Sequence, residues 1–488
     1  MASIKNQLEN PSNPNSPIET PRKRRQSLTE LWFKDQQLKH AIYKMQQHQT
    51  TSHNELGKKQ ANLKTLTLGD DLFSLIGDEN LQLILSKVPV LEHELISAVC
   101  KRWYYVLGKI RRSICLLDWG FLISGRLIDR FTNLSEVNLV PACFRSSMSS
   151  GIVVSHKIVK INVDTAVVSD GLIGKGGILG CELIDNGLKL IGSGCSNLRK
   201  LCVVNASEEG LRAVAENCDT LQELEVHCCE DMVLRSFSKF RNLQILKLSG
   251  YVEGLYESVV SDIGLTILAQ GCRRLVKLEL SGCEGSYDGI KAIGQCCQML
   301  EELTICGHRM SGGWLAALSY CSNLKTLKLQ SCESIDVCPG PDEHLGSCPT
   351  LEELYLERCQ VREKEGVRAL FLVCKFVKEI SFLDCWGLDD DLFRYAAVCR
   401  RVKSISLEGC SLLTTIGLDS VVQNWKELQT LKVVSCNNIQ DAEITPELAT
   451  LFSVLKELKW RPNSRSLLAT SLSGTGVGKK GGRFFKRV

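Results

Sequence analysis

The segment Cys-Arg-Arg-Leu-Val-Lys-Leu-Glu-Leu-Ser-Gly-Cys, residues 272–283, decides the fold of this chain of 488 residues. Two cysteines frame three aliphatic residues, Leu275, Leu278 and Leu280. The alternation from Leu278 to Leu280 puts both side chains on one face of a short strand. The same frame recurs in five further segments, which begin at Cys218, Cys321, Cys348, Cys374 and Cys399.

Weaker copies extend this frame into a long array. From Leu198 to Leu455 the first aliphatic positions follow one another at steps of 22 to 32 residues, and two still weaker copies begin at Leu134 and Ile158. A stretch with helical spacing follows the strand, as at Leu265 and Leu268. One strand and one helix cannot bury their apolar faces alone, so the copies must stack. The pattern predicts an α/β leucine-rich-repeat solenoid of about 12–13 repeats over residues 119–460, with short parallel strands on the concave side and helices outside.

Fifteen of the 24 cysteines occupy the two framing positions, eight before the first aliphatic residue and seven after the third. The polar segment from Met1 to Pro17 shows no signal peptide, so we expect a reducing compartment and no disulfides. No Cys-x-x-Cys pair occurs, which disfavours a zinc site. We therefore expect packing cysteines, no metal and no cofactor.

The net charge of +4 conceals an uneven distribution. Residues 70–460 are net −9, whereas 1–69 and 461–488 are both basic. An acidic body disfavours nucleic acid, and no run approaches the ~18 apolar residues of a membrane span. We expect a basic, partly disordered extension over 1–69 with an amphipathic helix at about 27–45, and a basic disordered tail over 461–488. The basic run 22–25 is compatible with nuclear import, so the nucleus, the cytoplasm or both are expected.

A helical hairpin is predicted before the repeats. Apolar residues from Leu81 to Val88 recur at helical spacing after the acidic pair Asp78 and Glu79, and Pro89 ends this helix. A second helix is predicted over residues 92–105, with Leu95, Val99 and Trp103 on one face. Such a small all-α hairpin is not stable alone and must dock onto something.

The hairpin resembles an F-box, with Ile76 and Gly77 in place of the Leu-Pro of that family and a closing Val-Cys-x-x-Trp at 99–103. With cysteine-type repeats downstream, the chain resembles the F-box proteins with leucine-rich repeats that are numerous in plants. The resemblance implies an F-box over residues 70–118 that binds a Skp-type adaptor and, through it, a cullin. It also implies a non-catalytic receptor whose repeats hold a protein substrate for ubiquitination and degradation. The residues that it assigns to adaptor binding are Ile76, Gly77, Asp78, Glu79, Leu81, Ile84, Leu85, Val88, Pro89, Val99 and Trp103.

Substrate contacts are expected on the concave face, where residues two and four positions after each first aliphatic residue point outward. They form an acidic path crossed by Tyr355, and the longest step between repeats adds two tyrosines. The candidate residues are Glu225, His227, Tyr251, Tyr256, Glu279, Lys328, Glu353, Tyr355 and Glu357. The glycine-rich segments 170–180 and 473–480 lack P-loop spacing. An interaction protein outside ubiquitination, such as a small-GTPase regulator, is the alternative.

Overall fold

The computed structural model describes residues 76–89, 92–144, 154–155, 177–252, 256–257 and 259–464, all of which belong to one compact unit, residues 76–488. Several sequence predictions lie outside these ranges. They are the helix at 27–45, the basic run 22–25, the weak repeat at Ile158, most of the glycine-rich segment 170–180, and the tail after residue 464.

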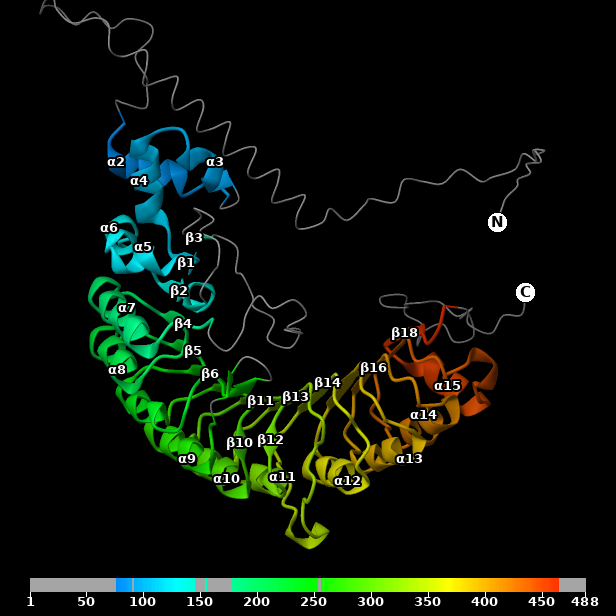
Figure 1. The fold of residues 1–488 in the computed structure, drawn as a ribbon. Coiled ribbons are helices and arrows are strands. Elements are labelled where there is room, and N and C mark those ends of the chain that lie inside the picture. Colours follow the sequence, from blue (N-terminus) through cyan, green and yellow to red (C-terminus); the bar gives the residue numbers. More distant parts are fainter. Residues whose placement is uncertain are drawn as a thin grey trace, which may run out of the picture. The chain divides into compact units, whose positions relative to one another are not determined.

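A sheet of fourteen strands runs through the described part of the chain, and its parallel strands follow one another in chain order (Figure 1). The short β3 (Val154–Ser155) is antiparallel to β1 at one edge. The parallel strands are β1 (Ser113–Leu116), β2 (Glu136–Asn138), β4 (Lys200–Val204), β5 (Glu223–His227), β6 (Ile245–Ser249), β9 (Lys277–Ser281), β11 (Glu302–Cys306), β13 (Thr326–Gln330), β14 (Glu353–Glu357), β15 (Glu379–Leu383), β16 (Ser404–Glu408), β17 (Thr430–Val434) and β18 (Glu457–Arg461).

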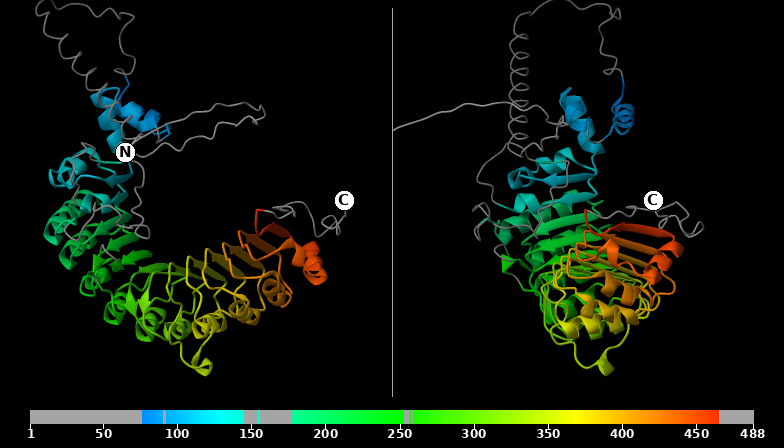
Figure 2. Two further views of the ribbon diagram at one scale, coloured as in Figure 1. Left: turned by 45° about the vertical axis from the view of Figure 1, so that its right-hand side comes forward. Right: turned by 90° about the vertical axis from the view of Figure 1, so that its right-hand side faces the viewer.

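Helices cover the outer, convex side of this sheet, and the strands line its concave side (Figures 1 and 2). The α-helices of this layer are α5 (Trp119–Ile123), α6 (Arg126–Arg130), α7 (Cys181–Gly194), α8 (Glu208–Asn217), α9 (Asp262–Gly271), α10 (Tyr287–Cys296), α11 (Trp314–Ala317), α12 (Lys364–Val373), α13 (Asp390–Phe393), α14 (Thr415–Val422) and α15 (Pro446–Val454). Short 3-10 helices also occur in the connections between strands: η3 (Val140–Cys143), η5 (Val233–Lys239), η6 (Leu318–Tyr320), η7 (Asp342–His344), η8 (Arg394–Val398) and η9 (Asp441–Glu443). The α/β leucine-rich-repeat solenoid predicted from the sequence is confirmed.

The repeated aliphatic residues build one continuous core between the strands and the helices. Leu278, Leu303 and Leu327 are register partners on neighbouring strands, and each is fully buried. The core continues in this way from Ile114 to Trp460. Stacking therefore supplies the burial that a single repeat cannot provide.

The framing cysteines lie between successive repeats. All fifteen are buried, and none of the 24 cysteines, which all lie in the described ranges, forms a disulfide. The thiol of Cys297 donates to the carbonyl oxygen of Cys272 at 3.4 Å, and that of Cys359 donates to Leu329 at 3.4 Å. Burial raises the pKa of Cys297 to about 12, which keeps its proton available for donation. The predicted packing role is confirmed.

Aspartates connect many helices to the preceding repeat, a feature that the repeat spacing does not predict. Asp262 accepts hydrogen bonds from the backbone N–H groups of Ser286 and Gly289, at 2.8 and 2.9 Å, and from the Ser286 hydroxyl at 2.6 Å. Its carboxylate thereby caps α10 from the neighbouring repeat. Equivalent side-chain pairs are Asp185 with Ser207, Asp231 with Ser261, Asp390 with Thr414 and Asp419 with Thr445.

Candidate functional sites

The first candidate site is the helical unit before the solenoid, which has a core of its own. It consists of α2 (Asp78–Leu85), α3 (His93–Ser97) and α4 (Lys101–Ile110). Leu81 and Leu85 are buried there together with Val106 and Leu107. The resemblance to an F-box assigns Leu81 and Leu85 to adaptor contacts. The structure corrects this assignment, because both side chains lie inside the unit and hold it together.

The predicted second helix is also corrected, because it is broken into α3 and α4. Cys100 is extended, with φ −160°, and its Sγ accepts a hydrogen bond from the backbone N–H of Trp103 at 3.5 Å. This contact starts a new helix at Lys101. Arg102 then joins α4 to the start of α2, since its Nε donates to Asp78 Oδ1 at 2.8 Å and its guanidinium also donates to the carbonyl of Ile76.

Several apolar side chains of this unit face solvent. Leu95 is 70% exposed, Leu83 is 64% exposed and Val99 is 62% exposed. Ile84 and Tyr105 are also exposed. The sequence predicts Ile84 and Val99 as contacts but not the other three. Leu83 could have been recognised, because it stands two positions from both Leu81 and Leu85 and so points away from their face.

The remaining predicted adaptor residues divide by exposure. Gly77, Asp78, Glu79 and Pro89 are exposed, whereas Ile76, Val88 and Trp103 are half-buried. Ile76 and Trp103 pack against the core of the helical unit. The exposed residues can contact a partner directly. Ile76 and Trp103 instead support the exposed residues by packing against the core of the unit.

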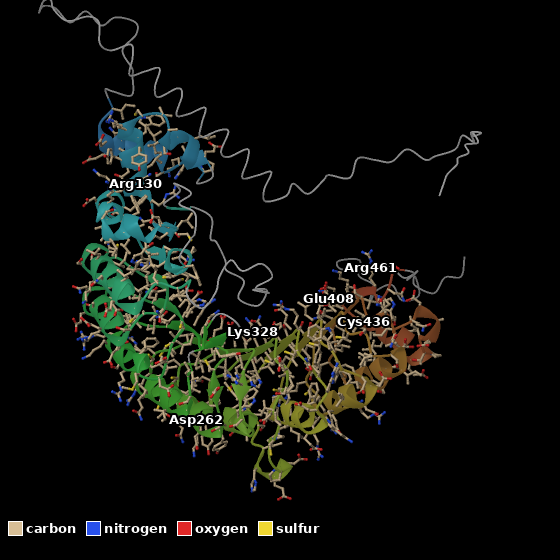
Figure 3. All side chains as sticks on the ribbon, in the orientation of Figure 1. Arg130, Asp262, Lys328, Glu408, Cys436 and Arg461 are labelled. Atoms are coloured by element: carbon tan, nitrogen blue, oxygen red, sulfur yellow. The ribbon has the colours of Figure 1, made fainter. Side chains whose placement is uncertain are left out.

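The helical unit is attached to the first repeat through α4. The guanidinium of Arg130, on α6, stacks over the ring of Tyr104 at 3.6 Å from its centroid (Figure 3). Asn133 donates to the carbonyl of Lys109 at 2.9 Å. Gly108 lies so close to α6 that an added Cβ would sit 2.6 Å from the carbonyl oxygen of Arg130. These contacts hold the helical unit against the first repeat. The sheet begins at Ser113, which lies inside the range expected for the F-box.

The second candidate site is the concave face of the sheet, where Lys328, Glu408 and Arg461 line the strand side in Figure 3. Lysines on this face pair with carboxylates of neighbouring strands, so the predicted acidic path is interrupted. The pairs are Lys200–Glu223 at 2.6 Å, Lys247–Glu279 at 3.2 Å, Lys277–Glu302 at 2.9 Å, Lys328–Glu302 at 2.6 Å and Lys432–Glu408 at 2.6 Å. The sequence could not show this pairing, because it depends on register between strands 22 to 32 residues apart.

Glu225 and His227 lie at the N-terminal part of this face and contact each other. His227 Nε2 lies 2.8 Å from Glu225 Oε1, and the His227 side chain is buried. Burial opposes ionisation of Glu225, but His227, Lys247 and Lys200 together lower its pKa to about 2. Glu225 is therefore held as a carboxylate, and the predicted contact at His227 is corrected, because its ring is closed off from solvent.

Four predicted residues come together near the middle of the sheet, on the adjacent strands β13 and β14. Lys328 and Tyr355 are register partners, and the Lys328 ammonium lies 5.8 Å from the centroid of the tyrosine ring. Burial raises the pKa of Tyr355, and the nearby carboxylates of Glu353 and Glu379 raise it further. Glu357 accepts a hydrogen bond from the Gln330 amide at 3.1 Å. The Tyr355 ring thus lies among charges of both signs, whereas Glu279 lies on β9, three strands from β14.

The two remaining predicted residues belong to a small hairpin above the repeats, formed by β7 (Tyr251–Val252) and β8 (Tyr256–Glu257). The guanidinium of Arg309 stacks on the Tyr251 ring at 4.4 Å. Arg309 belongs to β12 (Arg309–Met310), which pairs with β10 (Glu284–Gly285). Tyr256 pairs with Val252 through the backbone, and its side chain lies outside the described residues.

No cluster of three His, Cys, Asp or Glu side chains in the described ranges could hold a metal ion. No helix within them has the length and apolar character needed to cross a membrane.

The fold and the helical unit define a leucine-rich-repeat protein that carries an F-box, since residues 73–113 match the F-box domain family. The chain is homologous to F-box/LRR-repeat protein 12. The human protein is 26% identical over 219 residues, which cover 38% of this chain and 65% of that protein, and the bovine protein is 25% identical over the same shares. The chain therefore spans slightly less than two thirds of the length of these relatives.

Solved structures with a similar arrangement come from several sources. The yeast complex of Rad7 and Elc1 aligns with a TM-score of 0.32 and 13% identity, covering 87% of this chain and 98% of that chain. The TLR13–ssRNA13 complex aligns with a TM-score of 0.39 and 15% identity, covering 68% and 40%. An internalin from Listeria monocytogenes aligns with a TM-score of 0.31 and 14% identity, covering 59% and 89%.

Proposed function

We propose that this protein is the substrate-recognition subunit of a Skp–cullin–F-box ubiquitin ligase. The F-box would bind a Skp-type adaptor and, through it, a cullin, while the repeats hold a protein substrate. The observation that carries the proposal is the exposure of Leu83, Leu95 and Val99 on a helical unit whose core is already closed. A small unit of this kind with several apolar side chains in water is typical of a docking surface.

The adaptor surface has two layers in this proposal. Leu83, Ile84, Leu95, Val99 and Tyr105 make direct contacts, because they are the large exposed apolar side chains among the described residues of the unit. Buried leucines of α2, the half-buried Trp103 and the Arg102–Asp78 ion pair keep these side chains in place. Substitution of an exposed contact residue should lower the affinity for the adaptor. Substitution of a supporting residue should unfold the helical unit.

Substrate binding is assigned to the concave face, centred on Tyr355 and Lys328. An aromatic ring beside an ammonium group and several carboxylates can contact both apolar and charged side chains of a protein. The receptor itself performs no bond chemistry in this proposal. It brings a substrate lysine close to the activated ubiquitin of a separate enzyme, which makes the transfer effectively intramolecular.

Co-purification with a Skp-type adaptor tests this function. We expect the wild-type protein to capture the adaptor and the double variant Leu95→Asp/Val99→Asp to lose it, because two charges would enter the apolar contact. Met299→Asp is the matched control, since Met299 is an exposed apolar residue of the repeats, 53% exposed. Failure of the wild-type protein to capture any adaptor would rule out the proposal. Substitution of Leu81 is unsuitable, because its side chain is in the core.

Affinity capture after proteasome inhibition tests substrate binding separately. We expect Tyr355→Ala to lose substrate while it retains the adaptor, since the ring is far from α2–α4 in the order of the strands. The alternative of a small-GTPase regulator draws only weak support from an acidic concave face, and lysines of neighbouring strands interrupt that face.

A further inference from the structure

Basic residues gather along one edge of the C-terminal repeats, in the segments that lead from the helical layer into β15, β16 and β17. Three of them, Lys375, Arg400 and Lys426, occupy the same position in consecutive repeats, two residues before the first aliphatic residue. We call this surface the cationic edge. Its members are Lys375, Lys378, Arg400, Arg401, Lys403, Lys426 and Lys456.

The backbone holds these residues in register. The N–H of Lys403 donates to the carbonyl of Lys378 at 2.7 Å, and the N–H of Gln429 donates to that of Lys403 at 2.7 Å. Directly before Lys375 and Arg400, the thiol of Cys399 donates to the carbonyl of Cys374 at 3.6 Å. Cations at equivalent positions of neighbouring repeats are therefore stacked side by side, an arrangement that is repulsive unless anions neutralise it.

Only part of this charge is neutralised within the described residues. Lys378 pairs with Glu352 at 2.5 Å, and Lys403 lies 3.8 Å from Glu427. In the described ranges no carboxylate forms an ion pair with Lys375, Arg400 or Lys426, and all three side chains are exposed. The cationic edge thus retains several positive charges on a body that is net negative.

Favourable interaction of cations with the C-terminal ends of helices does not account for this clustering. In the three preceding repeats the same position is occupied by Gln298, Ser322 and Pro349. Those repeats stack equally well, since their core leucines are fully buried. The fold therefore does not require a cation there, and the three consecutive cations call for a different explanation.

The chemistry of the edge favours an acidic protein segment over a nucleic acid. Its aromatic residue, Phe376, has the Lys375 ammonium and the Arg401 guanidinium each 5.1 Å from its ring centroid. Both cations lie over a ring that is already half-buried, which leaves less of its face open to the base stacking that single-stranded nucleic acids use. The net negative body of the repeats would also repel a long polyanion.

We propose that the cationic edge is a docking surface for an acidic segment of a partner protein, which meets one exposed cation in each of three consecutive repeats. Carboxylates of such a segment would neutralise the stacked cations of Lys375, Arg400 and Lys426. This surface is separate from the concave face and from α2–α4. The inference therefore does not rest on the proposed function.

Fluorescence anisotropy with a labelled twelve-residue peptide of Asp and Glu tests the proposal on the full-length protein. We expect binding that weakens as salt increases, and a roughly tenfold or greater loss of affinity in Lys375→Glu/Arg400→Glu/Lys426→Glu. The matched control is Arg273→Glu/Arg274→Glu/Lys325→Glu, which reverses three charges on the same edge of earlier repeats, and it should bind almost as wild type does. Unchanged melting temperatures would show that both variants fold, because the reversed residues are on the surface.

Two outcomes would overturn the proposal. One is equal affinity of the peptide for the two triple variants, which would make binding a property of overall charge. The other is tighter binding of a labelled single-stranded RNA than of the peptide, lost in the first variant alone, which would make the partner a nucleic acid. A peptide of Asn and Gln of the same length controls for contacts that do not involve charge.

Discussion

At the residue scale, the buried histidine His308 gives the solenoid a defined pH response. His308 is 8% exposed and packs against the Trp314 ring, with centroids 5.6 Å apart. Its Nδ1 accepts a hydrogen bond from the backbone N–H of Met310 at 3.3 Å. Burial lowers its pKa from 6.5 to about 4, although the nearby backbone groups of Ser334 and Ile335 oppose the shift. The imidazole is therefore neutral at physiological pH.

We expect the free energy of unfolding to fall as the pH is lowered from 6.5 to 4. In this window the unfolded chain binds a proton at His308 that the folded chain does not bind, so acid favours unfolding. The shift of the pKa corresponds to a loss of roughly 3 kcal/mol over the window. Urea titrations at pH 7 and at pH 4.5 would measure it in wild type and in His308→Gln, which should be less sensitive to pH.

Exposed histidines provide the control for this experiment. His344 lies in η7 and is exposed, so His344→Gln should retain the pH response of wild type. An identical pH response in His308→Gln and wild type would show that groups other than His308 determine the loss of stability in acid. Glu225 contributes in a lower window, because its pKa near 2 makes its stabilisation disappear only as the pH falls below about 4.5.

At the scale of the element, the aspartates between repeats should determine how firmly each helix begins. Asp262 receives three hydrogen bonds from the first turn of α10. Asp262→Ala leaves these donors without their acceptor, and we expect a loss of about 2–3 kcal/mol. Hydrogen exchange should show that the substitution accelerates exchange of the amides of Ser286 and Gly289 more than that of amides elsewhere in the repeats.

Asp288 is the matched control for this prediction, because it is an exposed aspartate in the first turn of the same helix. Asp288→Ala should cost well under 1 kcal/mol, the usual range for a change in an exposed charge near a helix start. Equal losses in the two variants would show that Asp262 acts only through its charge and not through the three hydrogen bonds.

Elements that depend on local periodicity are predictable from this sequence, and contacts between distant elements are not. The Leu-x-x-Leu-x-Leu frame predicts strands such as β9, because alternation alone selects the buried face. The break between α3 and α4 is not predictable in this way, because the backbone at Cys100 turns extended inside a stretch with good helical spacing. Helical spacing also leaves open whether Leu81 or Leu83 faces the partner, since tertiary packing decides it.

In the candidate sites, too, local features are predictable from the sequence and contacts between strands are not. Outward positions on the strands follow from the pleat, so Lys328, Glu353 and Tyr355 are correctly expected on one face. The ion pairs across that face need the register of the folded sheet, which no local pattern contains. The cationic edge is present in the sequence as Lys375, Arg400 and Lys426, but its significance emerges only when the repeats are stacked.

At the scale of the whole molecule, a stack of repeats in which each contacts mainly its neighbours should respond locally to damage. Trp460 offers a test at the C-terminal end. Its side chain is fully buried, its ring centroid lies 4.9 Å from that of Phe452, and its Nε1 donates to Asp441 Oδ1 at 2.8 Å. β18, the last strand of the described residues, therefore closes this end of the described core.

Trp460→Ala removes a large buried side chain, for which we expect a loss of about 3–5 kcal/mol at the end of the stack. Because repeats are coupled through neighbours, hydrogen exchange should accelerate in α15, β17 and β18 and stay unchanged in β4, β5 and β6. Capture of a Skp-type adaptor should also be preserved, since α2–α4 have a core of their own. Trp386→Ala, at a tryptophan that is 51% exposed, is the control and should leave exchange nearly unchanged. Uniform acceleration over all strands would instead show that the solenoid unfolds as a single cooperative unit.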